Sequence, residues 1–175
     1  NRDGRICGLL SKKVFNKFEI FKIKDNNGNI YFPISAVCCK FSTLYMVSNQ
    51  KNKDQNFLAY SHRNSNNGNP LFLDIGNRNP IAIFGGSQNS AAIDTEGSII
   101  IITKDVFTSP VKVIQLPINE KAVSIAICNQ FIIALTSSGR LFEFTFSDNN
   151  TPTFSEIIET KGIEIVDISG SDDHC

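Results

Sequence analysis

The sequence predicts an all-β chain made of β-propeller blades, with about four repeats in 175 residues and the propeller incomplete. Three observations lead to this prediction. Apolar and polar residues alternate over short stretches, which is typical of strands. Tight-turn sequences, such as those at 26–29 and 136–139, separate these stretches. The whole pattern recurs about every 42 residues, and propeller blades of about four strands have such a period.

The first 32 residues hold the end of one repeat and a hairpin. Residues 1–10 are interpreted as the tail of a repeat, because DGRI at 3–6 matches SGRL at 138–141. Residues 15–23 predict one strand, and NNGN at 26–29 predicts a hairpin turn. The lysines between 12 and 24 indicate a solvated sheet edge rather than a phosphate-binding patch.

Three full repeats follow. Residues 33–62 form the first, and we expect the polar insertion KNKDQN within it to be a loop. Residues 80–103 form the second repeat and residues 121–146 the third. The segments after the repeats, such as NPLFLDI and TPTFSEIIE, each carry a proline followed by alternating apolar residues and predict a fourth, outer strand, where a missing N–H is tolerated.

The third repeat shows the pattern most clearly. Val123, Ile125 and Ile127 alternate with small residues, which predicts a strand with one apolar face. Residues 131–135 are apolar without a break, as expected of a strand covered on both faces. We therefore expect Ile125 and Ile133 to lie in the core. Alternation resumes at 141–146, completing a β-meander.

Turn residues fix the register of the repeats. The turn after the first strand lies at intervals of 47, 42 and 42 residues, at Cys39, Gly86, Cys128 and Gly170. Gly97 and Gly139, also 42 residues apart, follow the second strand. Glycine adopts positive φ without steric cost, so we expect Gly86, Gly97, Gly139 and Gly170 to be structural turn residues. Residues 162–175 then predict the start of a fourth, truncated repeat.

Repetition has a physical reason. A single small sheet cannot bury both of its faces, so each blade must stack on its neighbours until the ring closes. Four partial repeats leave apolar faces open. We therefore expect the remaining blades to come from a longer parent chain or from a partner chain, and this sequence to be a piece of a larger protein.

Composition excludes several classes of protein. The 17 basic and 17 acidic residues cancel, which argues against direct nucleic-acid binding and against a polybasic membrane anchor. No apolar run approaches the about 20 residues that span a bilayer. The five cysteines show no paired spacing, so we expect reduced thiols that behave as small apolar residues inside a cell.

No group of residues stands out as a catalytic, cofactor or metal site. GGS at 85–87 lacks the Gly-Lys-Ser/Thr of a phosphate loop and is interpreted as a turn. DDH at 172–174 is interpreted as a turn because three adjacent residues cannot all reach one ion. We expect no enzyme activity and no cofactor.

The residues also carry a family resemblance. SPVKVIQLPINEKAVSIAICNQFIIALTSSGRLFEF at 109–144 resembles the regulator of chromosome condensation repeat, and the segments at 80–102 and 162–174 are similar to the same pattern. The resemblance covers most of the chain from residue 33 onward. It implies a ring of about seven blades, as this class of propeller forms. It also implies protein partners, among them a small GTPase or a cytoskeletal protein.

The expected function is a protein-binding or scaffolding propeller, because rigid blades present variable loops to partners. Guanine-nucleotide exchange on a small GTPase is the alternative, and a cytoskeleton-associated structural propeller is a second one. The expected contact loops span residues 49–56 and 61–69, with Asn49, Lys51, Lys53, Asp54, His62 and Arg63 as contact residues. The expected location is the cytoplasm or cytoskeleton rather than the nucleus.

Overall fold

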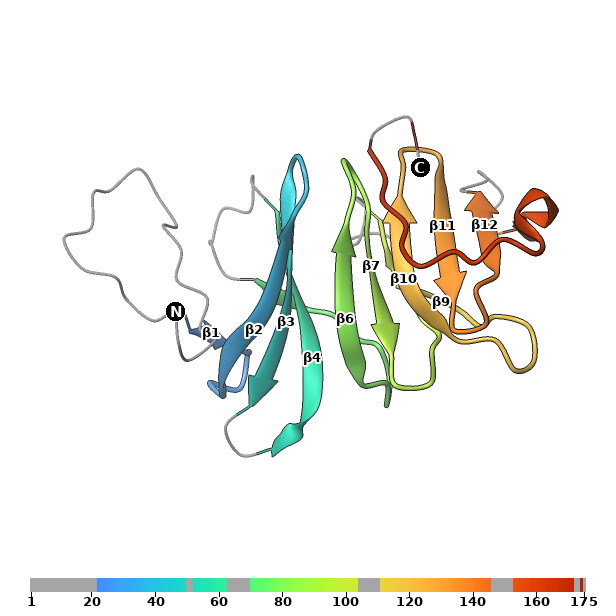
Figure 1. Ribbon diagram of the computed structural model, residues 1–175. Coiled ribbons are helices and arrows are strands. Elements are labelled where there is room, and N and C mark those ends of the chain that lie inside the picture. Colours follow the sequence, from blue (N-terminus) through green and yellow to red (C-terminus); the bar gives the residue numbers. More distant parts are fainter. Residues whose placement is uncertain are drawn as a thin grey trace.

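The chain folds into three antiparallel sheets that stand side by side, as the computed structural model shows (Figure 1). The structure describes residues 22–49, 52–62, 70–103, 111–145, 153–171 and 174. Within those residues the single helical element is a 3₁₀ turn, η1, Ile158–Thr160. No helix in these ranges is long and apolar enough to cross a membrane. The predicted all-β class is confirmed.

The first sheet has five strands in the order β1-β2-β3-β4-β5. They are β1 Ile23–Lys24, β2 Ile30–Cys38, β3 Ser42–Asn49, β4 Asn52–His62 and β5 Leu71–Phe72. Every strand pairs antiparallel with the next in sequence, so the sheet is a meander.

The second and third sheets are four-stranded meanders of the same design. The second contains β6 Pro80–Gly85, β7 Ser90–Asp94, β8 Ile99–Ile102 and β9 Lys112–Ile114. The third contains β10 Ala122–Ile127, β11 Phe131–Thr136, β12 Leu141–Thr145 and β13 Thr153–Glu156. Strands β5, β9 and β13 occupy the segments in which the sequence predicts outer strands.

The second sheet is buried on both faces, which explains its unbroken run of isoleucines. Ile100 and Ile102 face the first sheet, where they join a cluster with Leu44, Leu58 and Tyr60. Because side chains alternate along a strand, the intervening isoleucines of β8 face the third sheet instead. Each blade therefore shelters the apolar face of the next.

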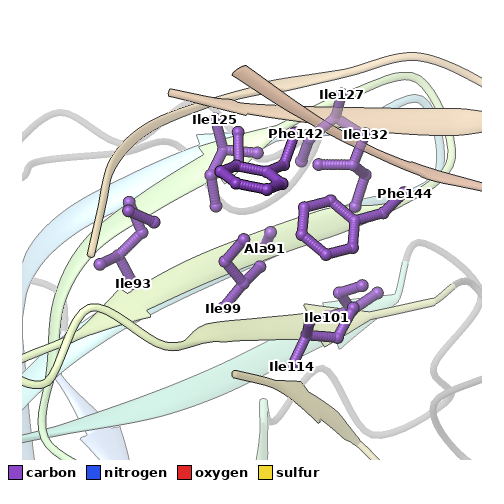
Figure 2. Packing of buried hydrophobic residues seen from close by; sticks show 12 residues of the cluster. Ala91, Ile93, Ile99, Ile101, Ile114, Ile125, Ile127, Ile132, Phe142 and Phe144 are labelled. Carbon is purple, nitrogen blue, oxygen red and sulfur yellow. The ribbon is translucent and has the colours of Figure 1, made fainter. Parts of the chain in front are cut away.

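The second and third sheets enclose the largest buried cluster (Figure 2). Phe142 and Phe144 of β12 and Ile132 of β11 project toward the isoleucines of the second sheet. Ile125 belongs to this cluster, as predicted. The core prediction for Ile133 is wrong, because Ile133 points to the other face of β11 and is only partly buried.

The outer face of the first sheet carries a third apolar cluster. Tyr31 lies between two phenylalanine rings there, with its ring centroid 5.3 Å from Phe57 and 4.6 Å from Phe72. Val47 and Ala59 complete the cluster together with Ile23 of β1. The added strand β1 extends the sheet beside β2, and its Ile23 enlarges an apolar face that no further blade covers within the described residues.

The polar insertion in the first repeat is strand rather than loop. β4 begins at Asn52, and β3 pairs with it through Asn49↔Asn52 and Ser48↔Asn56, with a register irregularity between the two pairs. The predicted loops at 49–56 and 61–69 are therefore wrong for residues 49 and 52–56 and for residues 61–62, which lie in β3 and β4. Residues 50–51 and 63–69 fall outside the described residues. Pairing with β3 supplies backbone hydrogen bonds that composition alone does not reveal.

The segment predicted to open a fourth repeat forms no strand between residues 162 and 171. Ile163 and Val166 are 59% and 83% exposed. Gly170 directly precedes a turn in which the Ser171 N–H donates to the C=O of His174, the same bond that closes the first turn of the three full repeats. A strand needs a neighbour for its N–H and C=O groups, and no described residue pairs with this segment. The number of blades in a closed ring remains a prediction.

The cysteines differ from the expectation of buried, reduced thiols. Cys38 is exposed and Cys39 partly buried, and both are free. Burial raises the pKa of the Cys39 thiol above its ordinary value. Cys128 is buried and disulfide-bonded, so the expectation of a reduced thiol is wrong at this position.

Candidate functional site

The strands of the three sheets run between two common ends, which differ in the turns and side chains found there. At the first-turn end, the N–H groups of Cys39, Gly86 and Cys128 each donate to the C=O three residues later. We name the opposite end the entry end, because β2, β6 and β10 begin there. It consists of the segments 76–79 and 117–121, the turns 94–98 and 136–140, and the ends of β3 and β4 at Asn49 and Asn52. It lies along the lower edge of Figure 1.

The predicted contact residues do not form one surface. Asn49 and Asp54 lie at the entry end, whereas His62 ends β4 at the first-turn end. With a rise of about 3.4 Å per residue, Asp54 and His62 lie about 27 Å apart along the strand. Lys51 and Arg63 fall outside the described residues, as does the Lys53 side chain.

An asparagine pair joins the first two blades at the entry end. The Asn79 side chain accepts a hydrogen bond from the Asn56 N–H at 2.9 Å and donates one to the Asp54 C=O at 2.9 Å. The side-chain amide of Asn56 in turn donates a hydrogen bond to the C=O of Pro80. Between the second and third blades, the residue equivalent to Pro80 is Ala122, whose backbone N–H donates to the C=O of Gly97. Pro80 has no N–H and cannot donate such a bond, so the side-chain amides of Asn56 and Asn79 link the first and second blades instead.

A buried carboxylate organises the second blade's entry end. Asp94 is 1% exposed and accepts hydrogen bonds from the N–H groups of Glu96 and Ser98. The Arg78 guanidinium pairs with it at 2.6 Å and also donates to the Ser98 hydroxyl at 3.1 Å. An open cavity of about 390 Å³ lies beside this pair, with Asn77 and Thr95 in its wall.

The third blade's entry end is held by a second ionic cluster. Arg140 pairs with Glu120 at 2.8 Å and with Glu156 of β13, and its guanidinium lies over the Phe142 ring. The Ser138 hydroxyl donates to Glu120 at 2.7 Å. The cluster therefore ties the segment 117–121 to the turn 136–140 and to the outer strand.

The two clusters share one equivalent position, in the entry segment, where the charge is reversed. Arg78 and Glu120 are 42 residues apart, as are Ser98 and Arg140. The entry segment supplies the cation in one blade and the anion in the next, and each bonds to the turn beside it. The sequence interpretation missed these residues. The repeat period aligns them, but charge reversal hides the likeness from a search for identical residues.

The third blade's cluster makes stability depend on pH. Burial raises the pKa of Glu120, but the hydrogen bonds from Ser138, Thr136 and Arg140 outweigh this effect and hold the pKa below its ordinary value. The hydrogen bond from Arg140 also lowers the pKa of Glu156. A carboxyl whose pKa is lowered by folding stabilises the fold above its unfolded pKa, and that stability is lost as pH falls through the folded pKa.

We therefore expect Arg140→Gln to flatten the acid dependence of stability. Urea unfolding at about pH 6 and about pH 3 measures the loss of unfolding free energy for each variant. The wild type should lose more than Arg140→Gln over this interval. Lys24→Gln removes a charge from the first sheet and should behave as wild type. Equal losses for wild type and Arg140→Gln would contradict this interpretation.

The predicted turn glycines lie in different environments. Gly97 and Gly139 adopt φ of 82° and 81° in equivalent turns. A Cβ at Gly97 would lie 2.5 Å from the Lys121 Cβ, whereas one at Gly139 would meet nothing within 4 Å. Gly86 begins the β6–β7 turn, and a Cβ there would lie 2.6 Å from an Ile127 methyl group. Gly86 and Gly97 therefore mark close approaches between blades.

Comparison with known proteins supports the fold. No family model and no curated protein sequence matches the chain. A chain in the crystal structure of Kap60 bound to yeast RCC1 (Prp20) is similar with a TM-score of 0.54 and 13% identity, over 81% of this chain and 40% of that chain. Prp20p from Saccharomyces cerevisiae is similar with a TM-score of 0.53 and 11% identity, over 93% of this chain and 56% of that chain.

These likenesses extend over part of the larger proteins only. This chain spans about two fifths to just over half of the solved chains it matches. At such low identity the likeness concerns the fold alone. The sheets and these neighbours together confirm that the chain forms blades of a β-propeller like that of RCC1.

Proposed function

We propose that this chain is part of a non-enzymatic, RCC1-like propeller that binds other proteins through its entry end. The observation that supports the proposal is the pair of ionic clusters at Arg78–Asp94 and Glu120–Arg140. They fix short turns on stacked sheets, so the surrounding surface is held in one shape. A preorganised surface loses little entropy when a partner docks.

The structural neighbours give indirect support. Yeast RCC1 (Prp20) was solved bound to Kap60, and Prp20p has binding properties toward Gsp1p and histones. A protein with this fold thus binds other proteins, which supports the same role for this chain. The partner of this chain is proposed to be another protein, with a small GTPase or a cytoskeletal protein as candidates.

Charge reversal at the entry end should reduce partner binding. Glu96 is exposed there, so Glu96→Arg changes the surface without disturbing the core. We expect proteins that co-purify with the wild type to be depleted with Glu96→Arg in quantitative mass spectrometry. Lys40→Glu reverses an exposed charge at the first-turn end and should keep them. Equal recovery with both variants would contradict docking at the entry end.

Guanine-nucleotide exchange is the second candidate, because the repeats resemble those of a family known for it and the fold agrees. Release of a fluorescent guanine nucleotide from a panel of small GTPases tests it directly. Under the scaffold proposal this chain accelerates none of them. Acceleration of any one that is lost on Glu96→Arg would replace the scaffold proposal with exchange activity at the same end.

The proposal includes a location in the cytoplasm or on the cytoskeleton. The free thiols of Cys38 and Cys39 agree with a reducing compartment, whereas the disulfide at Cys128 is more typical of an oxidising one.

A further inference from the structure

The first strand of every blade contains a β-bulge at the same place. Pairing passes directly from Pro33 to Ser35, from Pro80 to Ala82 and from Ala122 to Ser124. The residue skipped in each blade is a β-branched aliphatic: Ile34, Ile81 and Val123. These residues are 47 and 42 positions apart, so the bulge follows the repeat.

The bulges turn these three side chains out of the core. Ile34, Ile81 and Val123 are 42%, 53% and 52% exposed. Their neighbours Pro80 and Ala122, one position earlier, are buried. A bulge places one unpaired residue in a strand and redirects its side chain, which explains the contrast.

The three residues lie at one level of adjacent strands. β6 contacts β2, and β10 contacts β6, so the first strands of the blades are neighbours. Stacked sheets lie about 10 Å apart, which places successive bulge residues about 10 Å from each other. Single exposed aliphatics are ordinary on protein surfaces, but here three lie in register as a row across the blades. We name Ile34, Ile81 and Val123 the bulge strip.

Polar groups flank the bulge strip at the entry end. Most are already paired: Arg78 with Asp94, Arg140 with Glu120, and Asn79 with Asn56. Asp54 and Glu96 are exposed and form no ion pair with any described residue. The exposed cations at this end include Lys121 and Lys24, which pairs with Ile30 at the start of β2. The strip thus has an apolar centre and a polar rim that includes two carboxylates without an ion pair, the usual anatomy of a protein-binding surface.

We propose that the bulge strip receives an apolar side chain of a protein partner whose flanking lysine or arginine residues meet Asp54 and Glu96. This inference rests on the proposed protein-binding function and names the partner's chemistry. The apolar side chain removes the exposed area of the three aliphatics from water. The basic residues of the partner form ion pairs with the carboxylates of Asp54 and Glu96. The residues of the rim that are already paired keep their present partners.

Selection from a phage-displayed library of random peptides tests the proposal with the whole chain as bait. The retained peptides should share one large apolar residue with basic neighbours. Ile81→Ser/Val123→Ser should weaken their binding at least about tenfold, as loss of central apolar contacts does at interfaces. Phe41→Ser removes an exposed aromatic at the first-turn end and should leave binding unchanged. Thermal unfolding of each variant checks that the fold survives.

Asp54→Lys/Glu96→Lys provides a second test that leaves the strip itself intact. It should weaken the same peptides, and wild-type binding should decline with added salt. Peptides lost with Phe41→Ser but kept with Ile81→Ser/Val123→Ser would overturn the strip and leave protein binding standing. Failure to select any peptide would overturn the strip, whereas the co-purification experiment judges the proposed function separately. Photo-crosslinks from position 81 only to other parts of the same polypeptide would also overturn it.

Discussion

Replacing Gly97 with alanine will destabilise the protein much more than replacing Gly139. The two glycines share a turn type and a φ near 80°, so both substitutions cost about 1 kcal/mol for a left-handed backbone. At Gly97 the new methyl group would also meet the Lys121 Cβ at 2.5 Å and the Lys121 Cα at 2.8 Å. The backbone of the third blade would have to move, for a total of about 3 kcal/mol.

Urea unfolding of Gly97→Ala and Gly139→Ala measures this difference directly, since the second variant is a matched control for the first. Part of the loss in Gly97→Ala comes from the Ala122 N–H, which donates to the C=O of Gly97 across the joint. Amide hydrogen exchange should therefore speed up at Ala122 in Gly97→Ala and stay slow in Gly139→Ala. Equal destabilisation by the two variants would show that the second and third blades do not approach this closely.

Lysine at Ile132 will unfold the protein, whereas lysine at the adjacent Ile133 will be tolerated. Ile132 is fully buried between the second and third sheets, against Phe144 (Figure 2). A charge there has no partner, so Ile132→Lys costs about 4 kcal/mol or more. Ile133 is only partly buried on the other face and lies opposite Glu143 of β12. An opposite-charge cross-strand pair offsets much of the lost apolar burial, for a net cost of about 1 kcal/mol.

Circular dichroism melts of Ile132→Lys and Ile133→Lys distinguish stacked blades from other arrangements of these strands. A two-layer sandwich in which this face of β11 pointed to solvent would reverse the order of the two melting temperatures. Ile133→Lys/Glu143→Ala removes the cross-strand pair and should be less stable than Ile133→Lys alone. If the double variant matched the single one, the pairing with Glu143 would contribute nothing.

Local sequence was sufficient to predict strands and turns where the signal depends on neighbouring residues. Alternation in 121–127 and the turn at 136–139 predicted β10 and the β11–β12 turn because side-chain direction and backbone φ are local properties. The recurrence of this signal predicted the blades. It failed at residues 52–56, where polar composition suggested a loop, because pairing with β3 is a contact across the sheet.

The sequence by itself determined that this chain is a series of similar sheets, because the repeat period and the turn residues depend only on the order of the amino acids. Only the tertiary structure decided which residues meet across blades. The bond between Asn79 and Asn56, the approach of Gly97 to Lys121 and the register of Ile34, Ile81 and Val123 all join residues distant in sequence or in different sheets. The physical reason is that the stacking of two sheets sets distances of a few ångströms, to which a one-dimensional pattern is insensitive. The ion pairs of Arg78 and Glu120 show the same limit, because each entry segment pairs with the turn beside it although the charge is reversed and a different turn residue is the partner.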